Sequence, residues 1–245
     1  LPLKDFGRVA AGTAKQIVVQ KIKEAEKQSI SEEFQDKEGE LMVGTLSRED
    51  QNNYFVDLGR CSGILPKDQI IPGEKLEMGS SVKVYVSKLE IGPKGPFIML
   101  SRSHYGFVKR LLEIEIPELS DGTIMLYSVA RDAGSRSKIA VYTEYTNVDP
   151  IGAVIGEKGR RIANVLKELS GEKIDVILYD KDPVKFIANA LSPAKDVKVS
   201  IKDETKKEAL ALVNDKNLSL AIGKKGQNVK LASRLTHYKI EVKPE

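Results

Sequence analysis

The feature that constrains this chain most is an internal repeat built on a Gly-x-x-Gly segment. One copy runs through residues 154–162 and the other through residues 221–229, so that the copies are 67 positions apart. Apolar residues flank each copy at helical spacing, which predicts two helices joined by a tight loop. An alternating segment at 171–176 returns at 238–242 and predicts a strand after each helix pair. We infer that the chain repeats a complete structural unit.

The composition of the two loops suits a phosphodiester backbone. Glycine allows positive φ and a close approach of the backbone to a ligand. The helix that begins after each loop directs unpaired N–H groups outward, and loop lysines add full positive charge at the same point. The candidate RNA-contacting residues of the first loop and its surroundings are Ile155, Gly156, Lys158, Gly159, Arg160, Arg161, Arg136 and Lys138. Those of the second are Ile222, Gly223, Lys224, Lys225, Gly226, Gln227 and Asn228.

Plainer roles stay open for these residues. The isoleucines also fit a core position, and the polar residues that begin the second helix of each pair also fit simple solvent exposure. Arg136 and Lys138 also fit an ordinary turn. Glu157 places a negative charge in the first loop, so we expect the second loop to hold phosphates more strongly.

The charge of the chain is uneven. It has 39 basic and 35 acidic residues in 245, but residues 181–245 alone carry 14 basic and 8 acidic side chains. An excess of this kind favours an anionic partner. A single cysteine, Cys61, excludes an internal disulfide, and no apolar run is long enough to cross a bilayer. We therefore expect a cytoplasmic protein with no membrane association.

The sequence offers no sign of an enzyme. The usual nucleotide-binding and zinc motifs are missing, and the two histidines, His104 and His237, fit structural or surface positions. We expect no catalytic residue, no metal and no cofactor.

The predicted order of elements divides the chain into four parts. We expect a helix and linker in 1–38, with Asp5 as its cap and residue 28 near its end, five strands in 39–102, and two α-β-β-α-α-β units in 103–180 and 181–245. The apolar face of the first helix needs a partner, either the rest of the chain or a preceding portion. Asp149-Pro150 and Asp182-Pro183 are expected to begin helices. The short link at 179–182 predicts that the two units form one rigid platform.

The repeated unit resembles the KH family of RNA-binding domains, in which a Gly-x-x-Gly loop between two helices clamps about four nucleotides. Its element order resembles the type II arrangement. This resemblance implies that a single strand of RNA runs across both loops.

The part of the chain at 39–102 resembles the S1-type OB fold, a small closed barrel. Phe-Val-Asp-Leu-Gly at 55–59 and Gly-Ile-Leu-Pro at 63–66 carry this resemblance, although Pro66 stands where many S1 domains have histidine. The resemblance implies a face that stacks bases and follows the RNA backbone. Two roles stay open for the barrel, RNA contact or a spacer and protein-contact role. Its candidate RNA contacts are Tyr54, Phe55, Arg60, Lys83 and Lys88.

The whole arrangement, a multidomain α+β chain with an N-terminal helix, an S1-type barrel and two KH units, resembles the NusA family of bacterial transcription factors. The phrases that carry the resemblance include those at 5–8, 55–60, 71–74, 135–141, 147–153, 189–194 and 218–228. It implies a monomeric, non-enzymatic protein that associates with RNA polymerase, nascent RNA and other transcription factors, and modulates pausing, termination and antitermination. Only the last helix of the family's polymerase-contacting domain is recognisable, so we expect weakened polymerase affinity. The alternative is an RNA-binding module of an RNA-decay or ribosome-associated protein.

Overall fold

The computed structural model describes residues 3–245, with side-chain positions from residue 7 onward. The chain forms two compact units. The first consists of the chain up to Ile70 together with Leu76–Arg102, and the second consists of Ile71–Lys75 and Ser103–Glu245. Each unit is described separately below.

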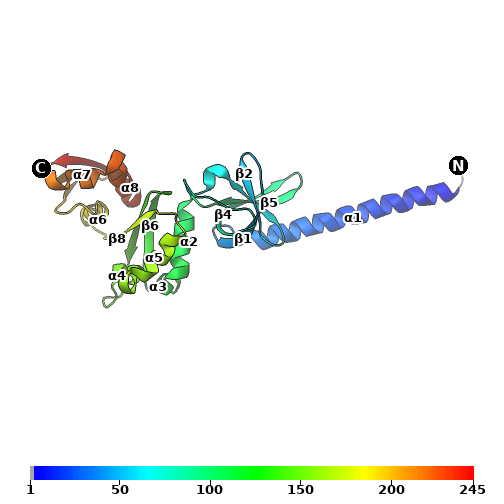
Figure 1. Cartoon of the computed structure of the whole chain (residues 1–245), viewed down its shortest axis with the longest axis horizontal. Coiled ribbons are helices and arrows are strands. Elements are labelled where there is room, and N and C mark those ends of the chain that lie inside the picture. The colour runs from blue at the N-terminus through cyan, green and yellow to red at the C-terminus, as the bar shows by residue number, and fades with distance from the viewer. Residues whose placement is uncertain (1–2) are drawn as a thin grey trace. The chain divides into compact units, whose positions relative to one another are not determined.

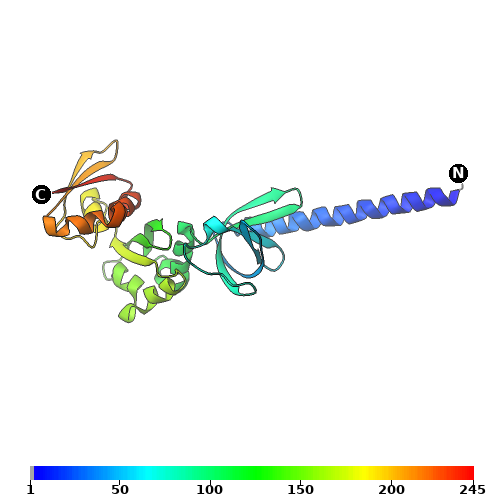
Figure 2. The ribbon, with the colours of Figure 1, turned by 45° about the horizontal axis from the view of Figure 1, so that its top comes forward.

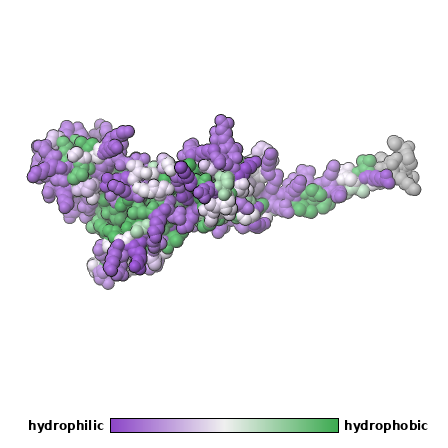
Figure 3. All heavy atoms as spheres, in the orientation of Figure 1, coloured by the Kyte–Doolittle hydropathy of each residue, from purple (hydrophilic) through white to green (hydrophobic). Residues whose placement is uncertain are grey.

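A single long helix, α1 (Leu3–Gln35), opens the first unit (Figure 1). It extends beyond the predicted end at residue 28, and Asp5 lies inside it, so the prediction of Asp5 as the cap is wrong. The last turns of α1 pack on the barrel, where Phe34 is buried and Ile30 contacts the same core. The apolar residues in its earlier turns stay exposed, as the hydrophobic patch along α1 in Figure 3 shows; they are Val9, Ile17, Val18, Val19 and Ile22.

The five strands of the first unit close into a barrel in the order β1-β2-β3-β5-β4. Their bounds are β1 (Leu41–Glu49), β2 (Asn53–Asp57), β3 (Ser62–Pro66), β4 (Ser81–Gly92) and β5 (Gly95–Ser101). A short 3-10 helix, η1 (Lys67–Gln69), follows β3. The interior is filled by alternating side chains of the strands, which confirms the predicted period of two. Its buried members are Leu46, Val56, Leu65, Val82, Val84, Val86, Ile98 and Leu100.

The first KH domain has the predicted element order with one addition, a short helix at residues 117–120. Its elements are α2 (Tyr105–Glu115), α3 (Pro117–Ser120), β6 (Met125–Asp132), β7 (Arg136–Tyr142), α4 (Pro150–Ile155), α5 (Arg160–Lys167) and β8 (Lys173–Leu178). Strand β7 is central, antiparallel to β6 and parallel to β8. The parallel pairing follows from the helix pair α4–α5, which carries the chain back to the starting end of the sheet. Because the strands of this sheet follow the order β6-β7-β8, strand β8 lies at an edge.

The second KH domain repeats this arrangement. It consists of α6 (Pro183–Ala190), β9 (Lys198–Asp203), β10 (Glu208–Val213), α7 (Asp215–Ile222), α8 (Gln227–Thr236) and β11 (Lys239–Pro244). The sheet order is β11-β10-β9, with β10 parallel to β11. The helices of this domain gather on one face of its sheet (Figure 2). The fold class predicted from the sequence is confirmed.

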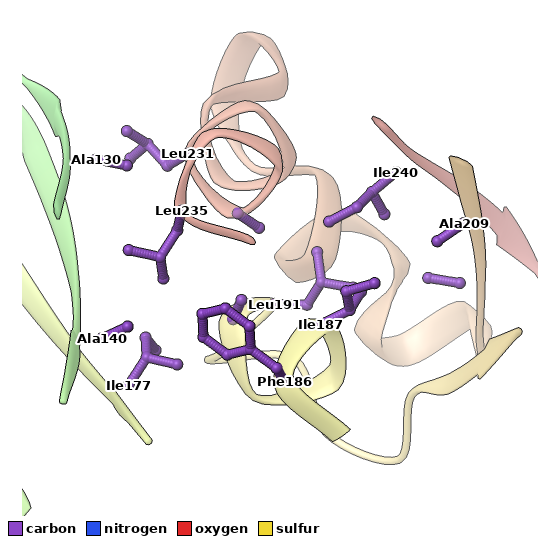
Figure 4. Close-up of a cluster of buried hydrophobic side chains, with 13 residues drawn as sticks. Ala130, Ala140, Ile177, Phe186, Ile187, Leu191, Ala209, Leu231, Leu235 and Ile240 are labelled. Atoms are coloured by element: carbon purple, nitrogen blue, oxygen red, sulfur yellow. The ribbon is translucent and has the colours of Figure 1, made fainter. Parts of the chain in front are cut away.

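The two KH domains share one hydrophobic core. Helices α6 and α8 lie between the two sheets (Figure 4). Leu231, Leu235 and Phe186 of these helices contact Ala130, Ala140 and Ile177 of the first domain within a single buried cluster. Tyr127 and Tyr179 stack beside this contact with ring centroids 3.9 Å apart, and Phe186 meets Tyr179 edge-on at 5.0 Å. A continuous apolar core fixes the two loops on one body.

The helix starts follow the sequence in most respects. The carboxylate of Asp182 accepts a hydrogen bond from the backbone N–H of Val184, as expected of a cap. Helix α4 begins at Pro150, but the side chain of Asp149 makes no capping hydrogen bond. In the described part of the chain no helix has the length and apolarity to span a membrane.

Candidate nucleic-acid interface

The two Gly-x-x-Gly loops have the same backbone. Gly156 and Gly223 both have a φ of 77°, with ψ values of 173° and 170°. Lys158 and Lys225 have φ values of 53° and 54°, and the closing glycine of each loop has a φ of 72°. Three of the four loop positions are thus in conformations that side-chain-bearing residues rarely adopt. This geometry accounts for the first glycine of each motif, and the second glycine lies in the left-handed region that glycine adopts at little cost.

The two glycines of each loop serve different purposes. A Cβ on Gly223 would lie 2.7 Å from the backbone nitrogen of Asn228, and one on Gly156 would lie 2.6 Å from Cγ of Arg161. The first glycine therefore lets the loop fold closely over the helix that follows. A Cβ on Gly159 would meet nothing within 4 Å. The second glycine has open space beside it, which leaves room for a ligand to approach the backbone.

The loop cations face solvent. Lys158, Lys224 and Lys225 are exposed, as are Arg160 and the acidic Glu157. In the part of the chain that the structure describes, none of these three lysines is paired with a carboxylate. The first loop thus presents one lysine and one glutamate, whereas the second presents two lysines.

Arg161 and Asn228 occupy equivalent positions after the two loops. Each forms hydrogen bonds that hold its loop in place. Arg161 donates to Glu118 at 2.7 Å and to the backbone oxygen of Ala153 at 2.9 Å. The side-chain amide of Asn228 is buried and donates to the backbone oxygens of Leu191 and Ala221, at 3.1 and 3.0 Å. Asn228 is 1% exposed, so the prediction that it contacts RNA is wrong. Its hydrogen bonds instead position the second loop.

The prediction that Lys138 contacts RNA is also wrong. It is completely buried, and its ammonium donates to Asp175 at 3.0 Å and to the backbone oxygen of Ser192 at 2.7 Å. Burial lowers the pKa of Lys138, while the nearby Asp175 carboxylate acts in the opposite direction. Because Ser192 belongs to the second KH domain, Lys138 joins the two domains and is not accessible to RNA. Arg136 makes two hydrogen bonds to the same carboxylate, at 2.7 and 2.9 Å, and is partly exposed.

The remaining candidates near the loops are partly or fully accessible. Ile155 is 37% exposed, and Ile222 is half-buried. Gln227 is half-buried, and its side-chain amide donates to Asp132 and to Ser135 at 2.7 Å each. It therefore ties the start of α8 to the β6–β7 turn of the first domain.

A groove of about 710 Å³ runs along the edge strand β8. One wall is formed by α4 and β8, and the other by the end of α6 and the segment that follows it in the second domain. Its lining includes Ile151, Val176, Leu178, Asn189, Ala194 and Lys195. Hydrophobic residues are visible on the surface around β8 in Figure 3. Sequence analysis did not single out these residues, although the strand following each loop was predicted and its edge position makes backbone N–H and C=O groups available.

The five barrel candidates do not form one surface. Successive residues of a strand point to opposite sides, and Tyr54 packs against the barrel core, so Tyr54 and Phe55 do not share a face. The ring of Phe55 is instead covered by Arg48, whose Cζ lies 4.0 Å from the ring centroid. The contact between Arg48 and Phe55 depends on the pairing of β1 with β2, which the sequence pattern does not give.

The basic candidates of the barrel have local partners. Arg60 is paired with Glu33 of α1, and Lys88 with Glu90. Lys83 is half-buried on β4, and its backbone oxygen accepts a hydrogen bond from Arg102. Within the described residues no group of three or more His, Cys, Asp or Glu side chains could hold a metal ion.

This fold and its paired loops define a class, the proteins in which tandem type II KH domains follow an S1-type barrel. Three family models match the chain: the NusA-like first KH domain over residues 102–179, the NusA-like second KH domain over residues 183–245, and the NusA N-terminal domain over residues 1–28.

Curated relatives lead to the same family. The chain is 49% identical over 242 residues to the transcription termination/antitermination protein NusA of Halalkalibacterium halodurans, and 49% identical to that of Bacillus subtilis. These alignments cover 99% of this chain and 63% and 65% of the relatives. The NusA of Mycobacterium tuberculosis is 44% identical over 246 residues, which cover 97% of this chain and 71% of that protein. The chain belongs to the NusA family and spans about two thirds of the length of these relatives.

Proposed function

We propose that this chain binds single-stranded RNA across both KH domains, with the second Gly-x-x-Gly loop as the stronger phosphate clamp. The observation that carries this proposal is the pair of loops with one backbone geometry, each presenting exposed lysine beside a helix start. Backbone N–H groups and lysine ammonium groups together suit phosphate oxygens.

The groove beside β8 supports a single strand rather than a duplex. A strand whose phosphates lie at the first loop can place its bases in this groove, against apolar side chains such as Val176 and Leu178. The edge of β8 offers backbone groups that can form hydrogen bonds with base edges. Bases are accessible in this way only when they are unpaired.

The shared core of the two KH domains supports one continuous binding surface. Helices α6 and α8 are buried against both sheets, and buried Lys138 of β7 holds the segment at Ser192 against the sheet of the first domain. This segment also lines the groove of the first domain. A strand leaving the first groove therefore meets the second domain on a rigid body, which lowers the entropy cost of binding both loops.

We propose further that this RNA binding serves transcription. The relatives are named as transcription termination/antitermination proteins, which favours a non-enzymatic, cytoplasmic and monomeric factor that associates with RNA polymerase and modulates pausing, termination and antitermination. The names of the relatives disfavour a role in RNA decay or in the ribosome. Co-purification with RNA polymerase, rather than with an exonuclease or ribosomes, is the result that this proposal expects.

The experiment that tests RNA binding compares two pairs of adjacent lysines. Lys224→Asp with Lys225→Asp should reduce the affinity for a fluorescent single strand of about a dozen nucleotides by about a hundredfold at low salt. Lys206→Asp with Lys207→Asp makes the same change in charge on an exposed turn, and Lys207 has a φ of 55°, close to that of Lys225. This control pair should keep most of the affinity.

Both variants should retain the thermal unfolding of the parent chain, followed by circular dichroism. No affinity of the parent for any single strand at low salt would refute RNA binding by this chain. Equal losses in the two variants would show that affinity depends on net charge and not on the second loop.

A further inference from the structure

A second groove, which we call the α8 groove, lies between the two KH domains beside the second loop. It has a volume of about 390 Å³. The β6–β7 turn forms one side through Asp132 and Ser135, and the second loop and α8 form the other. The lining residues are all polar or charged, so the groove does not suit an apolar ligand.

The α8 groove is strongly positive. Lys224, Lys225, Lys230 and Arg234 line it together with a single acid, Asp132. In the described part of the chain none of the four cations forms an ion pair with a carboxylate. Arg234 donates one hydrogen bond, at 3.1 Å, to the backbone oxygen of Arg131. A backbone oxygen carries no net charge, so the guanidinium keeps its full charge and further N–H donors for an anion.

Hydrogen bonds between the two KH domains fix the position of the residues that line the α8 groove. Gln227 donates from its amide nitrogen to Asp132 and to the hydroxyl oxygen of Ser135, at 2.7 Å each. The Ser135 hydroxyl accepts this bond and retains its own proton to donate to a ligand oxygen. These contacts join the turn to α8, so the cations stand on a fixed surface rather than on a mobile loop.

The spacing of the cations matches a chain of phosphates. Lys230 and Arg234 are four residues apart on α8, a rise of about 6 Å along the helix. Lys224 and Lys225 continue the series at the start of that helix and belong to the second loop as well. An RNA strand held at the loop therefore meets positive charge continuously as it enters the α8 groove. Proteins that bind single-stranded nucleic acid use positively charged grooves of this kind to follow the backbone.

We propose that the α8 groove binds the phosphates of RNA that extends beyond the second Gly-x-x-Gly loop, so that the RNA site is longer than the two loops and the β8 groove. The proposal rests on the proposed RNA binding. It assigns Lys230, Arg234 and Ser135 to backbone contacts, for which no base preference is expected.

The test uses one core RNA that occupies both loops, of about ten nucleotides, and two longer RNAs with about four additional nucleotides at the 5′ or the 3′ end. One of the two extensions should raise affinity about tenfold at low salt and steepen the dependence of log K on log salt by about 1.4, for two further phosphate contacts. The other extension should have little effect, because the groove leaves the loop in one direction only.

The variant Lys230→Gln with Arg234→Gln should remove the gain from that extension. Its affinity for the core RNA should fall no further than that of Lys206→Gln with Lys207→Gln, which makes the same change in charge in the exposed turn between β9 and β10. Lys230→Gln alone, which leaves the bond from Arg234 to Arg131 intact, should remove about half of the steepening. Asp132→Asn should instead strengthen binding of the extended RNA severalfold, since it removes the one acid of the groove and keeps an acceptor for Gln227.

The outcomes separate the two proposals. If the core RNA binds but neither extension adds affinity or salt dependence, the α8 groove is not an RNA path, whereas RNA binding by the loops stands. If an extension adds affinity that survives Lys230→Gln with Arg234→Gln, the extra phosphates lie elsewhere. If the parent binds no RNA, the proposed function itself fails.

Discussion

Four cations of the first KH domain, on its sheet and on α5, are paired with carboxylates of the same domain, whereas the cations that line the second loop and the α8 groove face solvent. Arg131 makes two hydrogen bonds to Glu172, with both side chains almost fully buried, and Arg136 and Lys138 share Asp175. Arg161 is paired with Glu118. Exposed cations on the sheet of the second domain also form surface ion pairs. The cations that line its loop and the α8 groove form no such pair in the described part of the chain; they are Lys224, Lys225, Lys230 and Arg234.

This difference separates two uses of positive charge within one fold. The buried cations of the first domain are paired because an unpaired buried charge is costly. They hold the sheet and the domain contact, so they contribute to stability more than to binding. The exposed cations of the second domain contribute little to stability, and their charge remains available for phosphates. The loop backbone is common to both domains, so it does not explain the difference.

Glycine-to-alanine substitutions should have the largest effect on stability, and they test the backbone conformation that the two loops have in common. Gly223→Ala should lower the free energy of unfolding by about 3 kcal/mol, because φ of 77° with ψ near 170° is restricted to glycine and the new Cβ would meet the backbone of α8. Gly156→Ala should cost a similar amount. Gly226→Ala should cost only about 1 kcal/mol, since its left-handed conformation is strained for alanine but unobstructed. Urea unfolding of the three variants measures these values, and equal costs at Gly223 and Gly226 would contradict this account of the loop.

Lysine-to-alanine substitutions sharpen the contrast between the domains. Lys138→Ala should destabilise the chain by about 2 kcal/mol, since it removes a buried donor from Asp175 and from Ser192 and leaves a cavity. Lys225→Ala should change the unfolding free energy by less than about 0.5 kcal/mol and weaken RNA binding instead. Thermal unfolding and RNA titration of both variants make the comparison. A stable Lys138→Ala chain that has lost RNA affinity would reverse the assignment.

Arg161 and Asn228, which follow the loops, should give effects no larger than that of Lys138→Ala. Asn228→Ala leaves two buried carbonyl oxygens without a donor and should cost about 2 kcal/mol. Arg161→Ala should cost about 1 kcal/mol, because its pair with Glu118 is partly exposed and therefore screened. Hydrogen exchange of the loop amides provides the measurement. Faster exchange confined to the altered domain is expected, whereas unchanged exchange would show that neither side chain supports its loop.

The sequence predicts the loops well because their requirements are local. Two glycines, a following helix and a strand are all encoded within one short repeat, and each was found where it was expected. The exposed positive charge of the second loop could also be predicted, because Lys224 and Lys225 lie in a turn. Domain boundaries at 38/39, 102/103 and 180/181 stay predictions.

The burial of Lys138 depends on the second domain. The alternation of Arg136, Lys138 and Ala140 along β7 gives no local sign of a covered face. Residues 137–141 of β7 are nevertheless all buried, because α6 and α8 of the second domain cover the side of the sheet that would otherwise be exposed. Such docking is a tertiary effect that no local pattern contains. Burial of Asn228 is also a tertiary effect, because Leu191, which follows α6, lies beside it.

In the first unit, the sequence pattern could have predicted the faces of β2 but not the length of α1. Alternation along β2 already separates Tyr54 from Phe55, so these two aromatic residues could have been assigned to opposite faces from the sequence. The length of α1 was underestimated because its last apolar residues, Ile30 and Phe34, contact the barrel and do not continue the earlier helical stripe.

The most direct test of the central claim, that charge and not backbone distinguishes the two loops, is an exchange of their second residues. Glu157→Lys should steepen the salt dependence of RNA binding by about 0.7 to 1, Lys224→Glu should flatten it by a similar amount, and the chain with both substitutions should return near the parent value. Thermal unfolding should be unchanged in all three, because both positions are exposed. Shifts of the same sign for the two single substitutions, or no shift at Glu157, would contradict the account, since the first loop would then not hold phosphates in the way that the second does.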